Sequence, residues 1–451
     1  MDAMTQTLEQ GDSPVDEPAR LAPRPKSLAD TGLSQPFLAD LLSKHLLTAG
    51  VLSLNQITKS MCLPARLLED ILHFMRQEAR VEVLPVDIET GALRYGLTDR
   101  GRALAANAFA IGGYAGPAPV PLSEYVELVK SQTVHDHNVT GHDVRQAFSD
   151  MVVSDDLLDR IGPSLNSGRA IFIYGPAGTG KTYLTSRMAR VFSSSVLIPH
   201  AISINETVVS IFDPVIHKAI TRETRSSLTI EDNVDERYVL CERPAIVVGG
   251  ELTEDMLEIQ FDPNNREYRA PLQLKANNGL FIIDDMGRQR VAPQTVFNRW
   301  ILPLEEKRDY LSLGSGRHFS VPFDLVLVFS TNMKPADLAD EAFLRRIGYK
   351  IRFPHLEPHQ YEEIWRDQCL ENGIPFDPSV VDYVINGLHK QHRVPLLPCH
   401  PRDLLGLSMD RAIYTNQPRE VTVEVLDWAW ENYFARTDED NEPNNKTGVQ
   451  Q

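Results

Sequence analysis

The sequence has little cysteine and no long apolar run. Its four cysteines lie far apart in a chain of 451 residues and form no Cys-x-x-Cys pair. Dispersed thiols of this kind are typical of reduced, packed residues and not of a disulfide framework or a zinc site. No uninterrupted run of about 18 apolar residues could cross a bilayer, and the polar, acidic stretch 1–25 lacks the apolar core of a signal peptide. We therefore expect a cytoplasmic protein without a membrane partner.

Positive charge is also in deficit. The chain holds 45 Lys and Arg residues against 62 Asp and Glu residues, a formal net charge of −17. This balance keeps a protein soluble and opposes unspecific attraction to nucleic acid or anionic lipid. A local basic face remains compatible with it, so the charge makes DNA binding less expected without excluding it. The histidines show no metal-ligand spacing either.

Length and composition predict several domains, because a chain of this length exceeds what one hydrophobic core usually serves. Both ends are polar and short of aromatic residues, which predicts a disordered arm at 1–33 and a disordered acidic tail at 437–451. Between them, the predicted parts are a small domain at 34–111, a Gly/Pro-rich linker at 112–122, an α/β core at 123–354 and a helical lid at 355–436.

The small N-terminal domain has the pattern of a helix, a helix-turn-helix and a β-hairpin. Ser53 is placed to cap a short helix, and Pro64 suits the start of the next helix, where its missing N–H costs nothing. Two short β-like runs then flank a turn at 89–91. This order resembles a winged-helix domain of the α+β class.

The charge of this domain bears on its role. Winged-helix domains often place their second helix in the major groove of DNA. The outward positions of the corresponding helix are Arg66, Glu69, Asp70, His73, Arg76 and Gln77. Their charges nearly cancel, whereas a DNA reader usually presents a basic face. The sequence therefore favours a protein-docking or structural domain, with DNA binding as the alternative.

The strongest motif is a phosphate-binding loop. An apolar run at 170–174 leads into GPAGTGKT at 175–182 and then into a helical pattern, which is GxxxxGK[ST] in the setting that the motif requires. Backbone N–H groups of such a loop turn inward around a phosphate, and the helix N-terminus adds its positive end. Lys181 is expected to reach the β- and γ-phosphates of ATP and the Thr182 hydroxyl to bind Mg²⁺. The predicted nucleotide-binding residues of this segment are Gly175, Pro176, Ala177, Gly178, Thr179, Gly180, Lys181, Thr182 and Tyr183.

Polar residues follow two further apolar runs. The run 279–283 ends at Asp284 and Asp285, and the run 325–330 is closely followed by Asn332. Beside a phosphate-binding loop, Asp284 is expected to hold Mg²⁺ through water and Asp285 to orient and deprotonate the attacking water. Asn332 is expected to hydrogen-bond that water or the γ-phosphate, although Asn after a strand is also a common turn residue.

The order of these motifs resembles that of the AAA+ ATPase family over residues 145–436. The resemblance implies a P-loop parallel-sheet α/β core with a C-terminal helical lid. It also implies that Val152, upstream of the loop, lines the adenine pocket. Arg346 is similar to the arginine finger that acts on ATP in a neighbouring subunit, with Arg345 as the alternative. Arg402 resembles the second sensor of the lid, which contacts the γ-phosphate in its own subunit.

Two features depart from the family pattern. Many members carry Asp-Glu where this chain has Asp284-Asp285. Aspartate is one methylene shorter, so water is expected to sit less well and turnover to be slow, although some DNA-handling members also carry Asp-Asp. Lys181 and Asp284 are also unusually far apart, and the strand-like runs between them, with a turn at Asn205-Glu206, predict an inserted hairpin and irregular structure.

These features predict a nucleotide-driven machine. A second hairpin, predicted at 310–319, loosely resembles one in the MoxR-like branch of the family, whereas no clear substrate-gripping loop is visible. The resemblance implies ATP and Mg²⁺ as cofactors and a homo-oligomer, a hexamer by family. We expect an ATPase that hydrolyses ATP as an oligomeric ring to remodel a protein partner, whose identity the sequence does not give. The alternatives are a DNA-associated ATPase or regulator that uses the winged helix, and a slow nucleotide-dependent switch.

Overall fold

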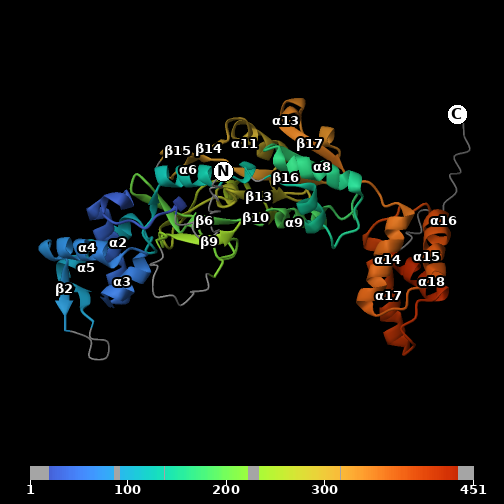
Figure 1. Ribbon diagram of the computed structural model, residues 1–451, viewed down its shortest axis with the longest axis horizontal. Helices are drawn as coiled ribbons and strands as arrows, with labels where there is room; N and C mark the ends of the chain where they lie inside the picture. Colours follow the sequence, from blue (N-terminus) through green and yellow to red (C-terminus); the bar gives the residue numbers. More distant parts are fainter. Residues whose placement is uncertain (1–19, 86–91, 137, 222–232, 315, 435–451) are drawn as a thin grey trace, which may run out of the picture.

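The computed structural model describes residues 20–85, 92–136, 138–221, 233–314 and 316–434 (Figure 1). β-sheets form its centre, with the N-terminal helices at one end and the C-terminal helices at the other. The α/β class expected from the sequence is confirmed, because a parallel sheet carries the phosphate-binding loop and a set of helices follows it. None of the helices in these ranges is long and apolar enough to cross a membrane.

The N-terminal part packs helices around a three-stranded antiparallel sheet of order β1-β3-β2. Its elements are α2 (Gln35–Ala49), β1 (Val51–Ser53), α3 (Leu54–Met61), α4 (Ala65–Gln77), β2 (Val81–Leu84), β3 (Arg94–Leu97) and α5 (Asp99–Ile111). Ser53 caps α3 as expected, since its hydroxyl accepts Gln56 N–H while Gln56 Oε1 accepts Ser53 N–H. The turn predicted at 89–91 lies outside the described residues, and the winged-helix resemblance stays a prediction.

The segment 20–33 is not the disordered arm that its composition predicts, because it packs along the rest of the chain. Arg24 N–H donates to Asn233 O at 2.8 Å. The guanidinium of Arg237, which is 2% exposed, donates to Thr31 O at 3.0 Å. A buried guanidinium needs several acceptors, and this segment supplies one from a region distant in sequence. The earlier part of the predicted arm and the predicted tail lie outside the described residues.

The predicted linker at 112–122 is also packed and is not a free joint. Ala118 and Val120 are fully buried, and Ala118 N–H donates to Met61 O at 2.8 Å. Strand β4 (Val120–Pro121) pairs with β7 (Ala201–Ile204) of the adjoining sheet. Gly and Pro residues predicted a hinge, but the apolar residues between them join two neighbouring cores.

Five parallel strands form the central sheet, in the order β10-β13-β16-β5-β17. They are β5 (Ala170–Tyr174), β10 (Ala245–Val248), β13 (Gly279–Ile283), β16 (Leu325–Thr331) and β17 (Ile347–Arg352). Every residue of β13 and β16 is buried, as expected of parallel strands that are covered on both faces.

Helices cover both faces of this sheet. Helices α8 (Asp155–Asn166) and α9 (Lys181–Met188) pack on one face, and α11 (Pro293–Glu306) and α13 (Glu341–Arg346) pack on the other. Along β5, Ile171 and Ile173 belong to the first core and Phe172 to the second. This alternation follows from the two-residue period of a strand.

The long stretch between α9 and β13 forms further sheets, as the sequence predicted. Strands β7 (Ala201–Ile204), β8 (Thr207–Ser210), β11 (Gln260–Asp262) and β12 (Glu267–Arg269) join β4 in the order β11-β12-β8-β7-β4, and β6 (Ser195–Pro199) pairs with β9 (Tyr238–Glu242). The predicted turn at Asn205-Glu206 connects β7 to β8, with φ of 48° and 67° at the two residues, as in a type I′ turn. The second predicted hairpin is formed by β14 (Arg308–Ser312) and β15 (His318–Pro322).

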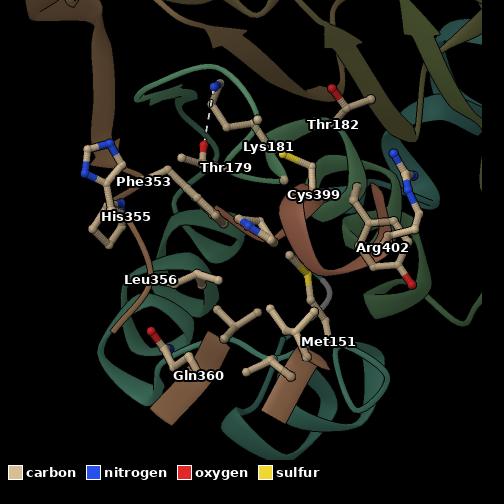
Figure 2. Close-up of a pocket in the computed structure, with 18 of the residues that line it drawn as sticks. Met151, Thr179, Lys181, Thr182, Phe353, His355, Leu356, Gln360, Cys399 and Arg402 are labelled. Atoms are coloured by element: carbon tan, nitrogen blue, oxygen red, sulfur yellow. Dashed lines mark hydrogen bonds between the residues drawn. The ribbon is translucent and has the colours of Figure 1, made fainter. Parts of the chain in front are cut away.

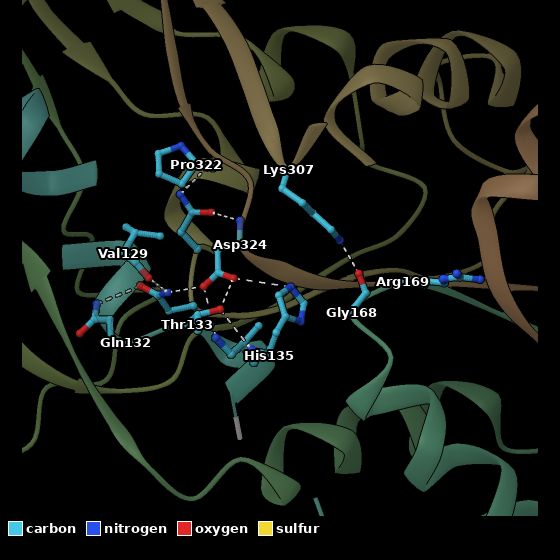
Figure 3. Close-up of polar contacts among 12 residues, drawn as sticks. Val129, Gln132, Thr133, His135, Gly168, Arg169, Lys307, Pro322 and Asp324 are labelled. Carbon is cyan, nitrogen blue, oxygen red and sulfur yellow. Dashed lines mark hydrogen bonds and ion pairs between the residues drawn. The ribbon is translucent and has the colours of Figure 1, made fainter. Parts of the chain in front are cut away.

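A polar network closes the amino-terminal end of the central sheet (Figure 3). Asp324 directly precedes β16 and accepts a hydrogen bond from the Thr133 hydroxyl at 2.6 Å. His135 Nε2 lies 3.5 Å from the same carboxylate, and Lys307 donates to the Gly168 carbonyl oxygen nearby. The network holds the segment before α8 at the end of the sheet opposite the carboxyl ends of its strands.

The C-terminal helices have a core of their own, with Trp365 and Trp430 in it. They are α14 (Pro358–Asn372), α15 (Pro378–Asp382), the π-helix η5 (Tyr383–His389), α16 (Lys390–His392), α17 (Cys399–Thr415) and α18 (Val423–Tyr433). The remaining short helices are η1 (Ala29–Thr31), α6 (Leu122–Ser131), η2 (Val134–Asp136), α7 (Gly141–Ala147), η3 (Ala189–Val191), η4 (Glu254–Leu257), α10 (Leu272–Lys275) and α12 (Pro335–Leu338). The limits of core and lid remain predictions.

Candidate nucleotide-binding site

The phosphate-binding loop lies between β5 and α9, at the carboxyl ends of the parallel strands, where ligands of such sheets bind. Gly178 and Gly180 have φ of 78° and 89°, which residues with a side chain rarely adopt. Gly175 is required for another reason, since a Cβ there would lie 2.3 Å from Phe353 O. The loop can therefore keep this shape only with glycine at these positions.

A cavity of 680 Å³ opens beside this loop, between the core and the C-terminal helices (Figure 2). The predicted site residues that line it are Val152, Ala177, Gly178, Thr179, Gly180, Lys181, Thr182, Tyr183, Asp285, Asn332 and Arg402. Among the described residues predicted for the site, those outside its lining are Gly175, Pro176, Asp284 and Arg346. The cavity therefore collects side chains from the loop, from two strand ends and from the start of α17.

The ammonium group of Lys181 lies among neutral oxygens. Nζ donates to Gly175 O at 3.0 Å, to Pro176 O at 2.7 Å and to Asn332 Oδ1 at 2.7 Å. Burial lowers the pKa of Lys181, while the charge of Asp285 acts in the opposite direction. Because these three acceptors carry no charge, the positive charge of Lys181 is not neutralised by its hydrogen bonds. A phosphate group fits this position, where the loop N–H groups and the start of α9 also favour an anion.

Asp285 follows β13 with φ of 48°, a left-handed conformation that is uncommon outside glycine and concentrates at functional sites. Its Oδ1 accepts a hydrogen bond from Asn332 Nδ2 at 3.2 Å. Arg288 Nη1 lies 4.0 Å from the other carboxylate oxygen. Asn332 thus connects Lys181 to Asp285, and these three predicted residues meet at one end of the cavity.

Asp284 is held behind Asp285. Its Oδ1 accepts Asp285 N–H at 3.0 Å, and its carbonyl oxygen accepts Gln289 Nε2 at 2.8 Å. In the part of the chain that the structure describes, no group of three or more His, Cys, Asp and Glu could hold a metal ion. Mg²⁺ commonly binds through one or two protein ligands together with substrate phosphates. A hydroxyl such as that of Thr182 and a carboxylate such as that of Asp284 are ligands of this kind, although Thr182 lines the cavity and Asp284 does not.

The two predicted arginines have different surroundings. Arg402 lies in the first turn of α17 and lines the cavity from the side of the C-terminal helices. Arg346 ends α13, where Nη2 pairs with Glu305 Oε1 at 2.7 Å and Nη1 donates to Ala342 O at 2.6 Å. Arg345 is the more exposed of the neighbouring pair, with 73% of its side chain accessible against 26% for Arg346. The structure brings Arg402 to the site of its own chain and leaves Arg346 outside it.

The end of the cavity away from Lys181 contains Met151, next to the predicted Val152, together with two residues that the sequence did not single out. Figure 2 shows Met151, Leu356 and Gln360 at this end. Gln360 Oε1 accepts Glu357 N–H at 3.1 Å, which orients its amide at the start of α14. Helical spacing places Gln360 on one face of α14 together with later residues of that helix. The spacing does not distinguish a face that packs on the core of the C-terminal helices from a face that lines a cavity.

Similarity to known proteins is limited. A family model described as a domain of unknown function, DUF8689, matches residues 357–432, which cover nearly all of α14 to α18. No curated protein sequence matches the chain significantly.

Several solved structures resemble the chain at low identity. RuvB of Thermotoga maritima, described as a Holliday junction branch migration motor, is 11% identical with a TM-score of 0.38, over 64% of this chain and 73% of RuvB. NtrX of Brucella abortus is 13% identical with a TM-score of 0.39, over 66% of this chain and 56% of NtrX. Global similarity of this degree carries no function to this chain. Its P-loop α/β fold is evident instead from the parallel strand order and from the glycine loop between β5 and α9.

Proposed function

We propose that this protein binds ATP together with Mg²⁺ and hydrolyses it to ADP and phosphate. The observation that carries the proposal is the series of contacts from Lys181 through Asn332 to Asp285. Catalysis of phosphoryl transfer rests on positioning and on charge, and this series combines a cation for the phosphates with a carboxylate for water. The apolar side chains at the other end of the cavity suit a base.

Each side chain has a task in this proposal. Lys181 and the loop N–H groups would bind the phosphates. Thr182 and Asp284 would hold Mg²⁺, which supplies charge neutralisation on the phosphates when bound. Asp285 would orient a water molecule and accept its proton on a carboxylate oxygen. Asn332 would keep the carboxylate and the ammonium at a fixed separation.

Phosphate release from Mg·ATP at low salt tests the proposal. The wild-type protein is expected to bind ATP and release phosphate, and Lys181→Ala is expected to lose both. Lys59→Ala, on the exposed side of α3, is the matched control and should behave as wild type. A wild-type protein that neither binds ATP nor releases phosphate would contradict the proposal.

We further propose that the active form is a homo-oligomeric ring, hexameric by family resemblance, that remodels a protein partner in the cytoplasm. The position of Arg346 outside the cavity of its own chain supports a role in a neighbouring copy. Specific activity should then rise with protein concentration and reach a plateau. Constant specific activity, under conditions where light scattering records monomers and oligomers, would contradict this part.

A slow nucleotide-dependent switch is the second candidate, and the environment of Asp285 favours it. Its carboxylate is hydrogen-bonded to Asn332 and lies near Arg288, so it is partly engaged before any water is bound. A switch would bind ATP tightly and release almost no phosphate at any protein concentration. Turnover that increases with concentration would contradict the switch.

A further inference from the structure

A carboxylate at the start of α17 connects a cavity-lining arginine to α18, the last helix that the structure describes. Arg402 Nε and Nη2 contact Asp403 Oδ1 at 3.0 and 2.9 Å. The Tyr433 hydroxyl, on α18, donates to the other oxygen, Asp403 Oδ2, at 2.9 Å. The side chain of Arg402 is 71% exposed and that of Asp403 is 25% exposed. A cation that lines the cavity is therefore connected to α18 by two sets of hydrogen bonds.

We infer that Asp403 and Tyr433 are positioning residues, which hold the Arg402 guanidinium toward the terminal phosphate of bound ATP. The inference rests on the proposed function, because it requires a nucleotide in the cavity. Asp403 engages Nε and Nη2 of Arg402, and no described residue has a hydrogen bond with Nη1. Nη1 can therefore donate to an anion while the other edge of the guanidinium stays fixed.

Positioning is needed at this place for two reasons. An exposed arginine side chain has many rotamers, and fixing one of them when a ligand binds costs conformational entropy. The contact with Asp403 already restricts these rotamers, so less entropy is lost on binding. The helix that faces α17, α14, also places two acidic residues on the cavity, Asp367 and Glu371. Carboxylates repel phosphates, so a cation fixed on the same cavity helps to offset their charge. Tyr433 contributes indirectly, because its hydrogen bond limits the rotation of Asp403.

The test compares the affinities for ATP and ADP, measured on the full chain with Mg²⁺ by displacement of a fluorescent nucleotide. ADP lacks the phosphate that Arg402 would contact, so the ratio of the two affinities reports this contact. Tyr433→Phe removes only the hydroxyl and should lower the ratio about three- to tenfold, the range expected for one hydrogen bond of ordinary net strength. Tyr414→Phe, 91% exposed at the end of α17, is the matched control and should leave the ratio unchanged.

A double-mutant cycle separates positioning from a general loss of structure. In an Arg402→Ala background, Tyr433→Phe should no longer change the ratio. Asp403→Asn provides a second variant, in which the loss of positioning and the loss of negative charge have opposite effects on the ratio. Removing a negative charge near the phosphates would by itself favour ATP, so a fall in the ratio supports positioning.

Two outcomes would overturn the inference. One is an unchanged ratio in Tyr433→Phe, and the other is an equal fall when Arg402 is already absent. Thermal melting of each variant checks that the C-terminal helices remain folded, and Asp403→Asn decides the matter if Tyr433→Phe does not fold. A wild-type protein that binds no ATP would overturn the proposed function itself, so the two failures are distinguishable.

Discussion

Lys181 donates a hydrogen bond to Asn332 at 2.7 Å, although 151 residues separate them in sequence. The order of the strands explains this contact. Strand β16, which precedes Asn332, lies between β5, which precedes the phosphate-binding loop, and β13, which precedes Asp285. The carboxyl ends of the three strands meet at one edge of the sheet, so a side chain that follows the middle strand can reach both neighbours.

Replacing Asn332 is expected to affect hydrolysis more than nucleotide binding. Asn332→Ala removes an acceptor from Lys181 and a donor from Asp285, so the cation and the carboxylate lose their common support. We expect kcat to fall about 10- to 100-fold, the scale of losing a side chain that orients the groups of a site, with a much smaller change in ATP affinity. Steady-state phosphate release and equilibrium binding give the two values. Asn386→Ala, on an exposed part of η5, is the control, and an unchanged kcat in Asn332→Ala would contradict the role.

Two glycine-to-alanine substitutions should have opposite effects. In Gly175→Ala the new Cβ would lie 2.3 Å from Phe353 O, so the loop must shift, and ATP binding and the melting temperature should both fall. In Gly406→Ala the new Cβ meets nothing within 4 Å, and the residue lies inside α17. Alanine is favoured over glycine inside a helix by about 0.5–1 kcal/mol, so this variant should melt slightly higher. If Gly175→Ala and Gly406→Ala changed the affinity for ATP equally, the close approach of Phe353 would not be what shapes the loop.

The proposed role of Arg346 in a neighbouring copy can be tested by mixing variants. Arg346→Ala should abolish phosphate release and spare nucleotide binding. A mixture of Arg346→Ala with Lys181→Ala should regain activity, because some interfaces then combine an intact Lys181 from one copy with an intact Arg346 from the other. Arg345→Ala, mixed in the same way, tests the alternative finger. If only the mixture of Arg345→Ala with Lys181→Ala regains activity, Arg345 and not Arg346 acts on the neighbouring site. Full turnover by Arg346→Ala alone would exclude Arg346 from this role.

Arg237 is expected to be important for stability. It pairs with Asp235 at 2.8 Å, and both side chains are 2% exposed. Removal of one partner from a buried pair leaves an unpaired charge and costs about 3–5 kcal/mol, so Arg237→Leu should lower the free energy of unfolding by that amount. Replacing Asp235 by Asn in the same variant should restore part of the loss. Arg24→Leu, which removes a partly exposed pair with Glu236, should cost less than about 1 kcal/mol in urea unfolding. Similar losses for Arg237→Leu and Arg24→Leu would contradict the buried-pair argument.

The parts of the site that the sequence predicts are those whose geometry is local. The loop 175–182 sits between its own strand and helix, and Asp285 and Asn332 each follow an apolar run that has to be a buried strand. Contacts between distant segments were not predictable in this way. The burial of Arg237 against 20–33 depends on the insertion, and the link from Arg402 to Tyr433 depends on how α17 and α18 pack. Composition therefore wrongly predicted disorder for 20–33, whereas the apolar runs correctly predicted the strands that precede Asp285 and Asn332.

The C-terminal helices α14 to α18 should lose stability in mild acid because of two buried histidines. The rings of His389 and His400 have centroids 5.1 Å apart, and burial lowers the pKa of each to about 4. An unfolded histidine has a pKa of about 6.5, so between these values the unfolded state binds protons that the folded state excludes. The histidines therefore favour folding fully above pH 6.5, and this contribution decreases as the pH falls toward 4, by at most about 1.4 kcal/mol per pH unit for each. Thermal melting between pH 7.5 and 4.5 measures the slope.

Substitutions identify which histidines cause that slope. His400→Phe should reduce it, because His400 Nδ1 has no hydrogen-bond partner among the described residues and an apolar ring can take its place. His359→Gln, on the exposed side of α14, should melt with the wild-type slope. If His400→Phe keeps the full slope, the acid sensitivity of the C-terminal helices arises from other groups, and burial of this pair is not its cause.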